Sequence, residues 1–275
     1  MVTIEYHLYR VKFIKPSQLG LFASEMSASD LFSRALGEKP AIAMTHENVW
    51  HIGNIEYFND MTGSFAIGRT TKTTVERYDD KTGNFKEEID DSGPYTYVLF
   101  DRSIGLIGIA KKSKVAPDVS AIARKIKALL ESSSVVKESG VDVKVSIIPD
   151  PEDFILKIQR AYSIKKFRAY FTGPNPVDAD EIFQKPLSIY CQELNGNHGN
   201  IEVVGSSLNE EVVAVVAKST AATGNTASAI IQTENGKKTI KIQLKGDAVR
   251  VPVDSDISHK QALLELQEAY YRVRG

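Results

Sequence analysis

The sequence has a single cysteine and no long hydrophobic run, and each absence excludes a class of protein. Cys191 stands alone among 275 residues, so no disulfide scaffold can form within the chain. No apolar run approaches the roughly 18 to 20 residues that a membrane-spanning helix needs. The N-terminal segment alternates polar and apolar residues, unlike a signal peptide. We therefore expect a soluble, reduced, cytoplasmic protein.

Short catalytic and cofactor-binding motifs are also missing. The sequence has no Gly-x-Ser-x-Gly elbow, no His-x-x-x-His or Cys-x-x-Cys pair and no Gly-x-Gly-x-x-Gly loop. Residues 236–239 have the Gly-Lys of a P-loop without its upstream glycine. Cys191 follows Ile189 and Tyr190, which favours a buried structural cysteine over a nucleophile. These absences predict no metal and no cofactor, and they lean toward a protein that is not an enzyme.

Composition and length indicate an ordinary globular chain. The apolar fraction is 42% and the charged fraction 25%, and 275 residues can form one large domain or two smaller ones. Residues 131–140 are mostly small and polar, which is typical of a boundary. We predict a strand-rich α+β domain over residues 1–134 and a second α+β domain over residues 135–275.

The apolar pattern of the first half predicts strands with two helices. Period-two alternation over 3–14 indicates a half-buried strand, and further strands are expected at 48–57, 64–78, 95–100 and 104–110. Residues 78–85 indicate a hairpin turn, because Gly83 and Asn84 tolerate positive φ. Capped helices are expected at 27–36 and 117–130.

The second half alternates helices and strands. Strands are expected at 141–148, 164–172, 200–204, 227–233, 238–245 and 248–253. Helices are expected from 152, from 178 with an interruption at Pro186, at 208–218 and at 258–273. Asn235-Gly236 is a strong hairpin signal between two of the strands. The chain is therefore predicted to be α+β in two domains, the second with a mostly antiparallel sheet, a late hairpin and a C-terminal helix.

Charge is distributed in blocks although the total is −1. Residues 102–170 hold fourteen basic and seven acidic side chains, and residues 216–250 hold six and two. Residues 76–101 hold three basic and eight acidic side chains. Two basic blocks are thus hidden in a neutral sum, and they are either a binding surface for an anionic polymer or solvated surface.

The basic blocks contain the best candidates for contacts with nucleic acid. Residues 162–171 interleave three basic and four aromatic side chains, which suits phosphate neutralisation combined with base stacking. Lysines of the late hairpin are an even number of residues apart, which would place them on one face of a strand. Alternatively, they only protect a sheet edge from aggregation. The predicted site comprises Lys111, Lys112, Lys114, Arg124, Lys125, Lys165, Lys166, Arg168, Lys237, Lys241 and Lys245.

Two other interpretations remain open. Asp142 and Lys144 are spaced to share one side of a strand, as in a metal-dependent nuclease, with Asp101 and Asp118 as candidate partners. The same pair also suits a surface ion pair. Alternatively, the chain is a protein-binding sensor whose basic blocks are only solvated. The hydroxyl-rich loop 219–226 could bind a phosphate or serve as a connector.

The order of elements over residues 95–172 resembles the RexA/KwaB group of bacterial phage-exclusion proteins. The resemblance covers the strand pair 97–110 with its Ile104-Gly105 turn, the helix 117–130, and the β-α-β unit 141–172. It implies an antiviral protein that binds DNA with little sequence preference as a homodimer, and it carries over no catalytic residue. We therefore expect a non-enzymatic, sequence-tolerant DNA-binding component of a bacterial anti-phage system, with a nuclease or nuclease-associated subunit as the alternative.

The last expected helix suggests where two copies could meet. Tyr270 and Tyr271 lie on adjacent helix faces, so only one of them can face its own domain. We predict that Tyr271, with Leu264, contributes to a self-association surface.

Overall fold

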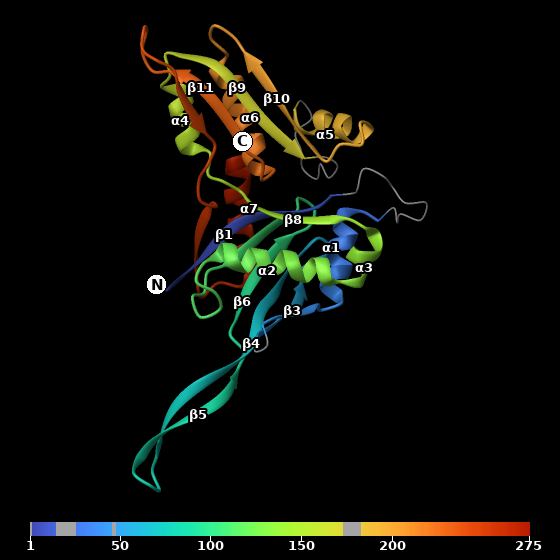
Figure 1. Cartoon of the computed structure of the whole chain (residues 1–275), viewed down its shortest axis with the longest axis vertical. Coiled ribbons are helices and arrows are strands. Elements are labelled where there is room, and N and C mark those ends of the chain that lie inside the picture. Colours follow the sequence, from blue (N-terminus) through green and yellow to red (C-terminus); the bar gives the residue numbers. More distant parts are fainter. Residues whose placement is uncertain (1, 15–25, 46–47, 173–182) are drawn as a thin grey trace.

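The structure, a computed structural model, describes residues 2–14, 26–45, 48–172 and 183–275, and it forms two lobes along one long axis (Figure 1). The large lobe is built on a nine-stranded sheet and the small lobe on a four-stranded sheet. Every pairing between the described strands is antiparallel. The fold is α+β, as the sequence predicts.

The larger sheet has the strand order β13-β1-β7-β6-β4-β3-β2, with β5 paired to β4 and β8 paired to β1. Two strands pair with the same edge of β1, one after the other: β13 pairs with Thr3–His7 and β8 pairs with Tyr9–Ile14. The strands are β1 (Thr3–Ile14), β2 (Ala41–Thr45), β3 (Asn48–Tyr57), β4 (Thr62–Asp79), β5 (Asn84–Ser92), β6 (Tyr95–Asp101), β7 (Leu106–Ala110), β8 (Asp142–Ile147) and β13 (Arg250–Asp254).

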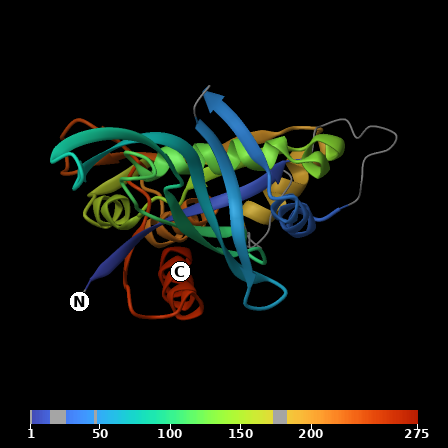
Figure 2. The ribbon, with the colours of Figure 1, turned by 90° about the horizontal axis from the view of Figure 1, so that it is seen from below.

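Helices cover both faces of the larger sheet. Its helices are α1 (Ala28–Gly37), α2 (Val119–Ser132), α3 (Ser134–Ser139) and α7 (His259–Arg274). The first three pack over one face through a cluster that contains Phe13, Phe100 and Ile126, and α7 packs over the other face through Leu266. Figure 2 shows α2 and α7 on opposite sides of the strands. No helix within the described ranges is both long and apolar enough to cross a membrane.

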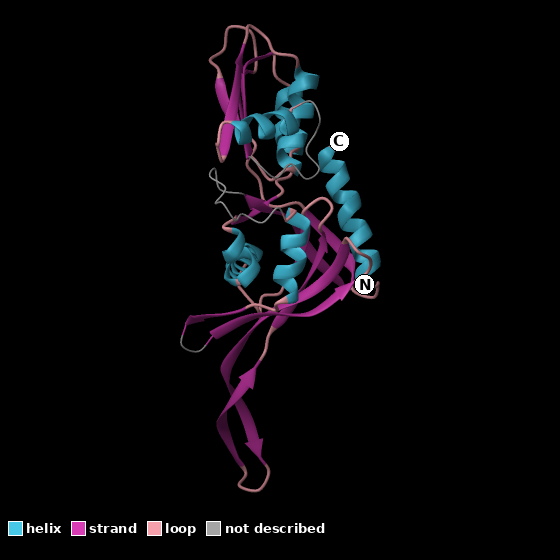
Figure 3. Cartoon of the chain, turned by 90° about the vertical axis from the view of Figure 1, so that its right-hand side faces the viewer, coloured by secondary structure: helices cyan, strands magenta, loops and turns pink. Residues whose placement is uncertain are grey.

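Among the described residues, helices cover only one face of the sheet of the small lobe. Its elements are α4 (Glu152–Gln159), β9 (Ser163–Thr172), α5 (Gln184–Glu193), β10 (His198–Val204), α6 (Glu210–Ala222), β11 (Ala227–Gln232) and β12 (Ile240–Gln243). The strand order is β10-β9-β11-β12. Phe167, Ala169 and Ala229 point toward the helices and are buried. Figure 3 shows the helices of this lobe gathered on one side of its strands.

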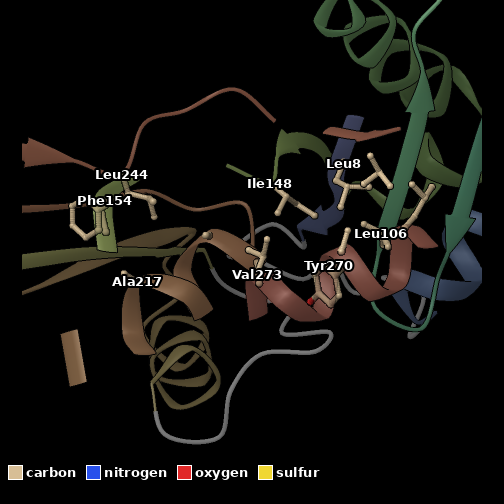
Figure 4. Packing of buried hydrophobic residues seen from close by; sticks show 14 of the residues in the cluster. Leu8, Leu106, Ile148, Phe154, Ala217, Leu244, Tyr270 and Val273 are labelled. Carbon is tan, nitrogen blue, oxygen red and sulfur yellow. The ribbon is translucent and has the colours of Figure 1, made fainter. Parts of the chain in front are cut away.

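The two lobes share a hydrophobic core. The chain leaves the large lobe after β8 and returns before β13, and Pro149 and Ala248 of the two crossings form a β-bridge. One buried cluster runs from Leu8 in the large sheet to Phe154 in the small lobe. Figure 4 shows Tyr270 and Val273 of α7 within it, on the way from Leu8 to Ala217. The terminal helix therefore packs against both lobes.

The division into sheets differs from the expected boundary at residues 134/135. β8 and β13 both belong to the sheet of β1, so the small lobe is an insertion between them. The stretch 131–140, where the boundary was expected, holds the end of α2 and then α3. Pro186 lies in the first turn of α5, where its missing N–H costs no helical hydrogen bond. The expected helix start at 178–181 falls outside the described residues.

Candidate nucleic-acid interface

The uncovered face of the small sheet carries the interleaved basic and aromatic residues. Alternation along β9 places Lys166, Arg168 and Tyr170 on the face opposite the buried Phe167 and Ala169. The neighbouring strands contribute the cross-strand partners of these residues to the same face. We call this surface the open face; its residues are Lys166, Arg168, Tyr170, Asn200, Glu202, Val204, Ser228, Ile230, Lys241 and Gln243.

Glu202 offsets part of the positive charge of the open face. Its carboxylate accepts hydrogen bonds from Lys166 Nζ at 2.8 Å and from Arg168 Nε at 2.7 Å. The hydrogen bonds from Lys166 and then Arg168 lower the pKa of Glu202 below its ordinary value, so it stays ionised at neutral pH. Hydrogen bonding with Tyr170 and with Glu202 raises the pKa of Arg168. The three charged groups form one solvent-exposed network with an excess of one positive charge.

Lys241 adds a third cation to the open face, beside apolar groups. It faces Ile230 across the β11–β12 pair, and Ile230 in turn faces Lys166. Lys241 forms no ion pair within the described part of the chain. Val204 is 67% exposed and Tyr170 36% exposed on this face. The open face thus combines cations with apolar and aromatic surface, the pairing that single-stranded nucleic acid requires.

The other predicted lysines of the late hairpin do not extend the open face. β12 is only four residues long, so Lys237 lies in the turn before it and Lys245 beyond its end. Lys237 is paired with Glu234 at 2.5 Å. Lys165 is out of alternation with Lys166 and donates to the carbonyl oxygen of Ser206 at 2.7 Å. Lys237, Lys241 and Lys245 are spaced to share one face of a strand, but only Lys241 lies within β12. The strand is shorter than the alternating pattern in the sequence.

The remaining predicted basic residues lie in the large lobe. Lys111 pairs with Glu5 at 3.4 Å, and Lys112 lies 4.9 Å from the ring centre of Tyr95. Lys125 lies 5.8 Å from the ring centre of Trp50. Lys114 is exposed in the turn before α2, and Arg124 is exposed on that helix. Figure 1 places α2 in the large lobe and β9 in the small lobe, so the basic block 102–170 is split between two surfaces.

The carboxylates of the nuclease hypothesis have separate structural roles. Asp142 and Lys144 are exposed on β8. Asp101 is buried and accepts hydrogen bonds from Ser103 and Gln267, and Asp118 is the N-cap of α2. Among the residues with described positions, no group of three His, Cys, Asp or Glu side chains could hold a metal ion.

A buried polar cluster at the junction of the lobes was not anticipated. Arg10 and Lys12 continue the face of β1 that begins with Tyr6 and Leu8, and they are only 2% and 4% exposed. Arg10 donates to the Tyr270 hydroxyl at 2.8 Å. The signal in the sequence was present: two cations stand where the alternation of β1 predicts apolar residues.

Hydroxyl and amide groups surround Lys12. Lys12 Nζ donates to Asn225 Oδ1 at 3.2 Å, and Thr172 donates to the same oxygen at 2.8 Å. Burial, with the nearby charges of Arg10 and Lys144, lowers the pKa of Lys12 well below its ordinary value. Residues 219–226 therefore serve this internal network rather than an exposed phosphate loop, since Thr220, Thr223 and Asn225 are all buried.

Comparison with known proteins identifies the family but not an activity. No curated protein matches the sequence. A family model described as "Domain of unknown function (DUF4747)" matches residues 29–268, which include most of both lobes and the whole of the open face. The chain therefore belongs to the DUF4747 family.

Proposed function

We propose that this protein is a non-enzymatic, sequence-tolerant DNA-binding component of a bacterial anti-phage system, and that it contacts DNA through the open face. One observation carries the proposal: a sheet face that no described helix covers displays Lys166, Arg168 and Lys241, together with the ring of Tyr170 further along β9. The anti-phage role rests on the resemblance of residues 95–172 to the RexA/KwaB group, and so does the homodimer.

The chemistry of the open face suits the DNA backbone and not a particular base sequence. Lysine and arginine neutralise phosphates with release of counterions, which gives affinity without base information. Tyr170 can stack on any base. Because Glu202 occupies Lys166 and Arg168 in the free protein, DNA must compete with an internal carboxylate for both cations. Binding is therefore expected to be weak and to fall steeply with salt.

The test is a salt-titrated binding measurement on several unrelated single-stranded and duplex DNAs, with and without magnesium. Lys166→Ala combined with Lys241→Ala should weaken binding to all sequences alike. It should also lower the log–log salt slope by about one for each phosphate that is no longer neutralised. Lys127→Ala is the matched control, because Lys127 is an exposed lysine of α2 outside the open face. Unchanged affinity and slope in the double variant would remove the open face from the site.

A second substitution tests the role of the internal carboxylate. Glu202→Gln keeps the shape of the side chain and removes its charge, so Lys166 and Arg168 should become available to phosphate and DNA affinity should rise. An affinity equal to that of the wild type would show that these two cations do not contact DNA. Magnesium-dependent cleavage in the same assays would favour the nuclease alternative over a non-enzymatic protein.

A further inference from the structure

Residues 71–92, which we call the arm, form a two-stranded ribbon that projects from the large lobe (Figures 1 and 3). On one side β4 pairs with β6 up to Gly68, and on the other side it pairs with β3 up to Thr70. Beyond that point β4 pairs only with β5, and the described part of the chain supplies no third strand to either of them. A two-stranded hairpin alone is marginally stable in water. The arm is therefore a candidate for a contact outside its own chain.

The two faces of the arm differ in how their charges are satisfied. On one face Arg77 pairs with Glu88 at 3.4 Å and Asp90 at 3.3 Å, and Lys86 pairs with Glu88 at 2.9 Å and Asp79 at 3.5 Å. This ion-paired face needs no partner. Side chains alternate along both strands, so the cross-strand pairs that lie between the ion-paired ones form the opposite face of the arm.

The other face, which we call the bare face, is apolar and carries a net negative charge, since its one basic residue, Lys72, lies opposite Asp91 at the base of the arm. Tyr78 and Phe85 are opposite each other with ring centres 5.1 Å apart, and Ile89 lies further along β5. These three side chains are 54%, 82% and 75% exposed. Glu76 and Glu87 are directly opposite each other between them, and neither forms an ion pair within the described residues. Like charges in a cross-strand pair repel, so the bare face favours an apolar partner surface that carries cations.

The open face of the small sheet has those properties. It offers Ile230, Val204 and Tyr170 as apolar surface, with Lys166 and Lys241 flanking Ile230. The arm and the small lobe lie at opposite ends of the long axis of the molecule (Figure 1). Two copies aligned side by side in opposite directions would bring each arm to the small lobe of the other copy, which closes a two-fold dimer.

We propose that the bare face of the arm docks on the open face of a second copy of this chain. Glu76 and Glu87 would face Lys166 and Lys241, while Tyr78, Phe85 and Ile89 would cover Ile230 and Val204. The docking uses the open face, which was assigned above to DNA. The competition between docking and DNA binding therefore rests on the proposed function. The acidic arm then occupies the DNA site, so this arm-docked dimer and DNA binding exclude each other. The arm-docked dimer is a different state from the DNA-bound homodimer that the resemblance implies.

The test is the mass of the full chain in solution at low salt and micromolar concentration. The wild type should be a dimer. Glu76→Lys combined with Glu87→Lys should weaken the dimer by about tenfold or more, because cations would then face cations. Adding Lys166→Glu and Lys241→Glu to the same chain should restore it. Asp80→Lys is the matched control, since this acidic residue lies at the tip turn of the arm and outside the bare face.

Three outcomes would overturn the docking: a monomeric wild type, a dimer insensitive to the arm charges, or a dimer broken by Leu264→Ser with Tyr271→Ser but not by the arm variant. These results are read from mass alone, so they do not depend on whether the protein binds DNA.

DNA added to the wild-type dimer should release monomers that carry DNA. A dimer that binds DNA without dissociating would contradict the shared surface.

Discussion

The side-chain nitrogen of Lys12 lies 3.2 Å from the amide oxygen of Asn225, and this contact joins β1 of the large lobe to the loop between α6 and β11 in the small lobe. Both side chains are buried. Asn225 also accepts a hydrogen bond from Thr172 and donates to Thr223 at 3.0 Å. The junction of the two lobes is therefore polar at this end of β1 and hydrophobic where Tyr6 and Leu8 face α7.

Lys12→Met should change how stability depends on pH. In the unfolded chain Lys12 binds a proton below its ordinary pKa of 10.5, whereas in the folded chain burial lowers that pKa. Folding therefore releases a proton between the two values, and this contribution makes the wild type more stable as pH rises toward 10.5. Urea unfolding across pH 7 to 10 should show the wild type gaining on the variant by at most about 1.4 kcal/mol per pH unit. Lys127→Met, at an exposed site, should show no such trend, and parallel curves for Lys12→Met would refute the assignment.

Glu38→Gln should destabilise the large lobe by about 1 kcal/mol, because Glu38 caps α3 from outside the helix. Its carboxylate accepts from the backbone N–H groups of Ser134 at 2.6 Å and Val135 at 3.0 Å. Burial raises the pKa of Glu38, but the backbone donors Val135 and Ser134 outweigh it and hold the pKa below 4.5.

The Glu38 contribution should be complete above pH 4.5 and lost as pH falls through the lowered pKa. Thermal unfolding of the wild type and Glu38→Gln should therefore converge from about pH 6 to about pH 3. Glu138→Gln, at an exposed position of α3, should leave stability nearly unchanged. A constant gap between the wild type and Glu38→Gln across that pH range would contradict the cap.

Gly108→Ala should destabilise the protein by about 1 to 3 kcal/mol through overpacking. A Cβ at Gly108 of β7 would collide with Leu266 Cδ1 of α7, and Leu266 is fully buried. The cost should shrink when Leu266→Ala is present, so the two substitutions should be non-additive in a double-mutant cycle. Gly53→Ala meets no atom within 4 Å and is the control. Additive effects would mean that α7 does not pack this closely on β7.

Asp142→Ala should leave both the fold and DNA affinity near wild type, because this carboxylate is exposed on β8 and lies outside the open face. The measurement is a salt-titrated DNA-binding assay, together with the integrity of the DNA after incubation with magnesium. Loss of biological activity in this variant, with fold and DNA binding intact, would instead support an enzyme.

Local patterns in the sequence predicted most elements but not their neighbours. The alternation over 3–14 and the capped helices after Ser27, Asp118 and Ser258 are confirmed within a residue or two. The burial of Cys191 is confirmed as well, and of the two adjacent tyrosines Tyr270 is buried while Tyr271 is exposed. Nothing local shows that β13 returns across the chain to pair with β1, since Ile4 and Val253 meet only through the long-range fold. The expected domain boundary failed to match the sheets for that reason.

Side-chain chemistry was harder to predict than secondary structure. Lys166 and Arg168 share the open face as their spacing indicates, but Glu202, which neutralises part of their charge, comes from a strand 34 residues away. The hairpin at 78–85 was predicted, and its register confirms it. Alternation identifies which residues share a face, yet it cannot tell that Phe85 and Ile89 meet solvent rather than a core.

The insertion of the small lobe between β8 and β13 also sets an order of events during synthesis. β1 is made first, but the edge that its N-terminal half offers to β13 stays open until residues 250–254 leave the ribosome. The face that α7 covers, with Leu8 and Leu106, stays bare for the same interval. A nascent chain would thus expose an unpaired strand edge beside an apolar surface for most of its translation, the combination that invites aggregation. Chaperone dependence should accordingly track the synthesis of β13 and α7, more than the folding of the small lobe that precedes them.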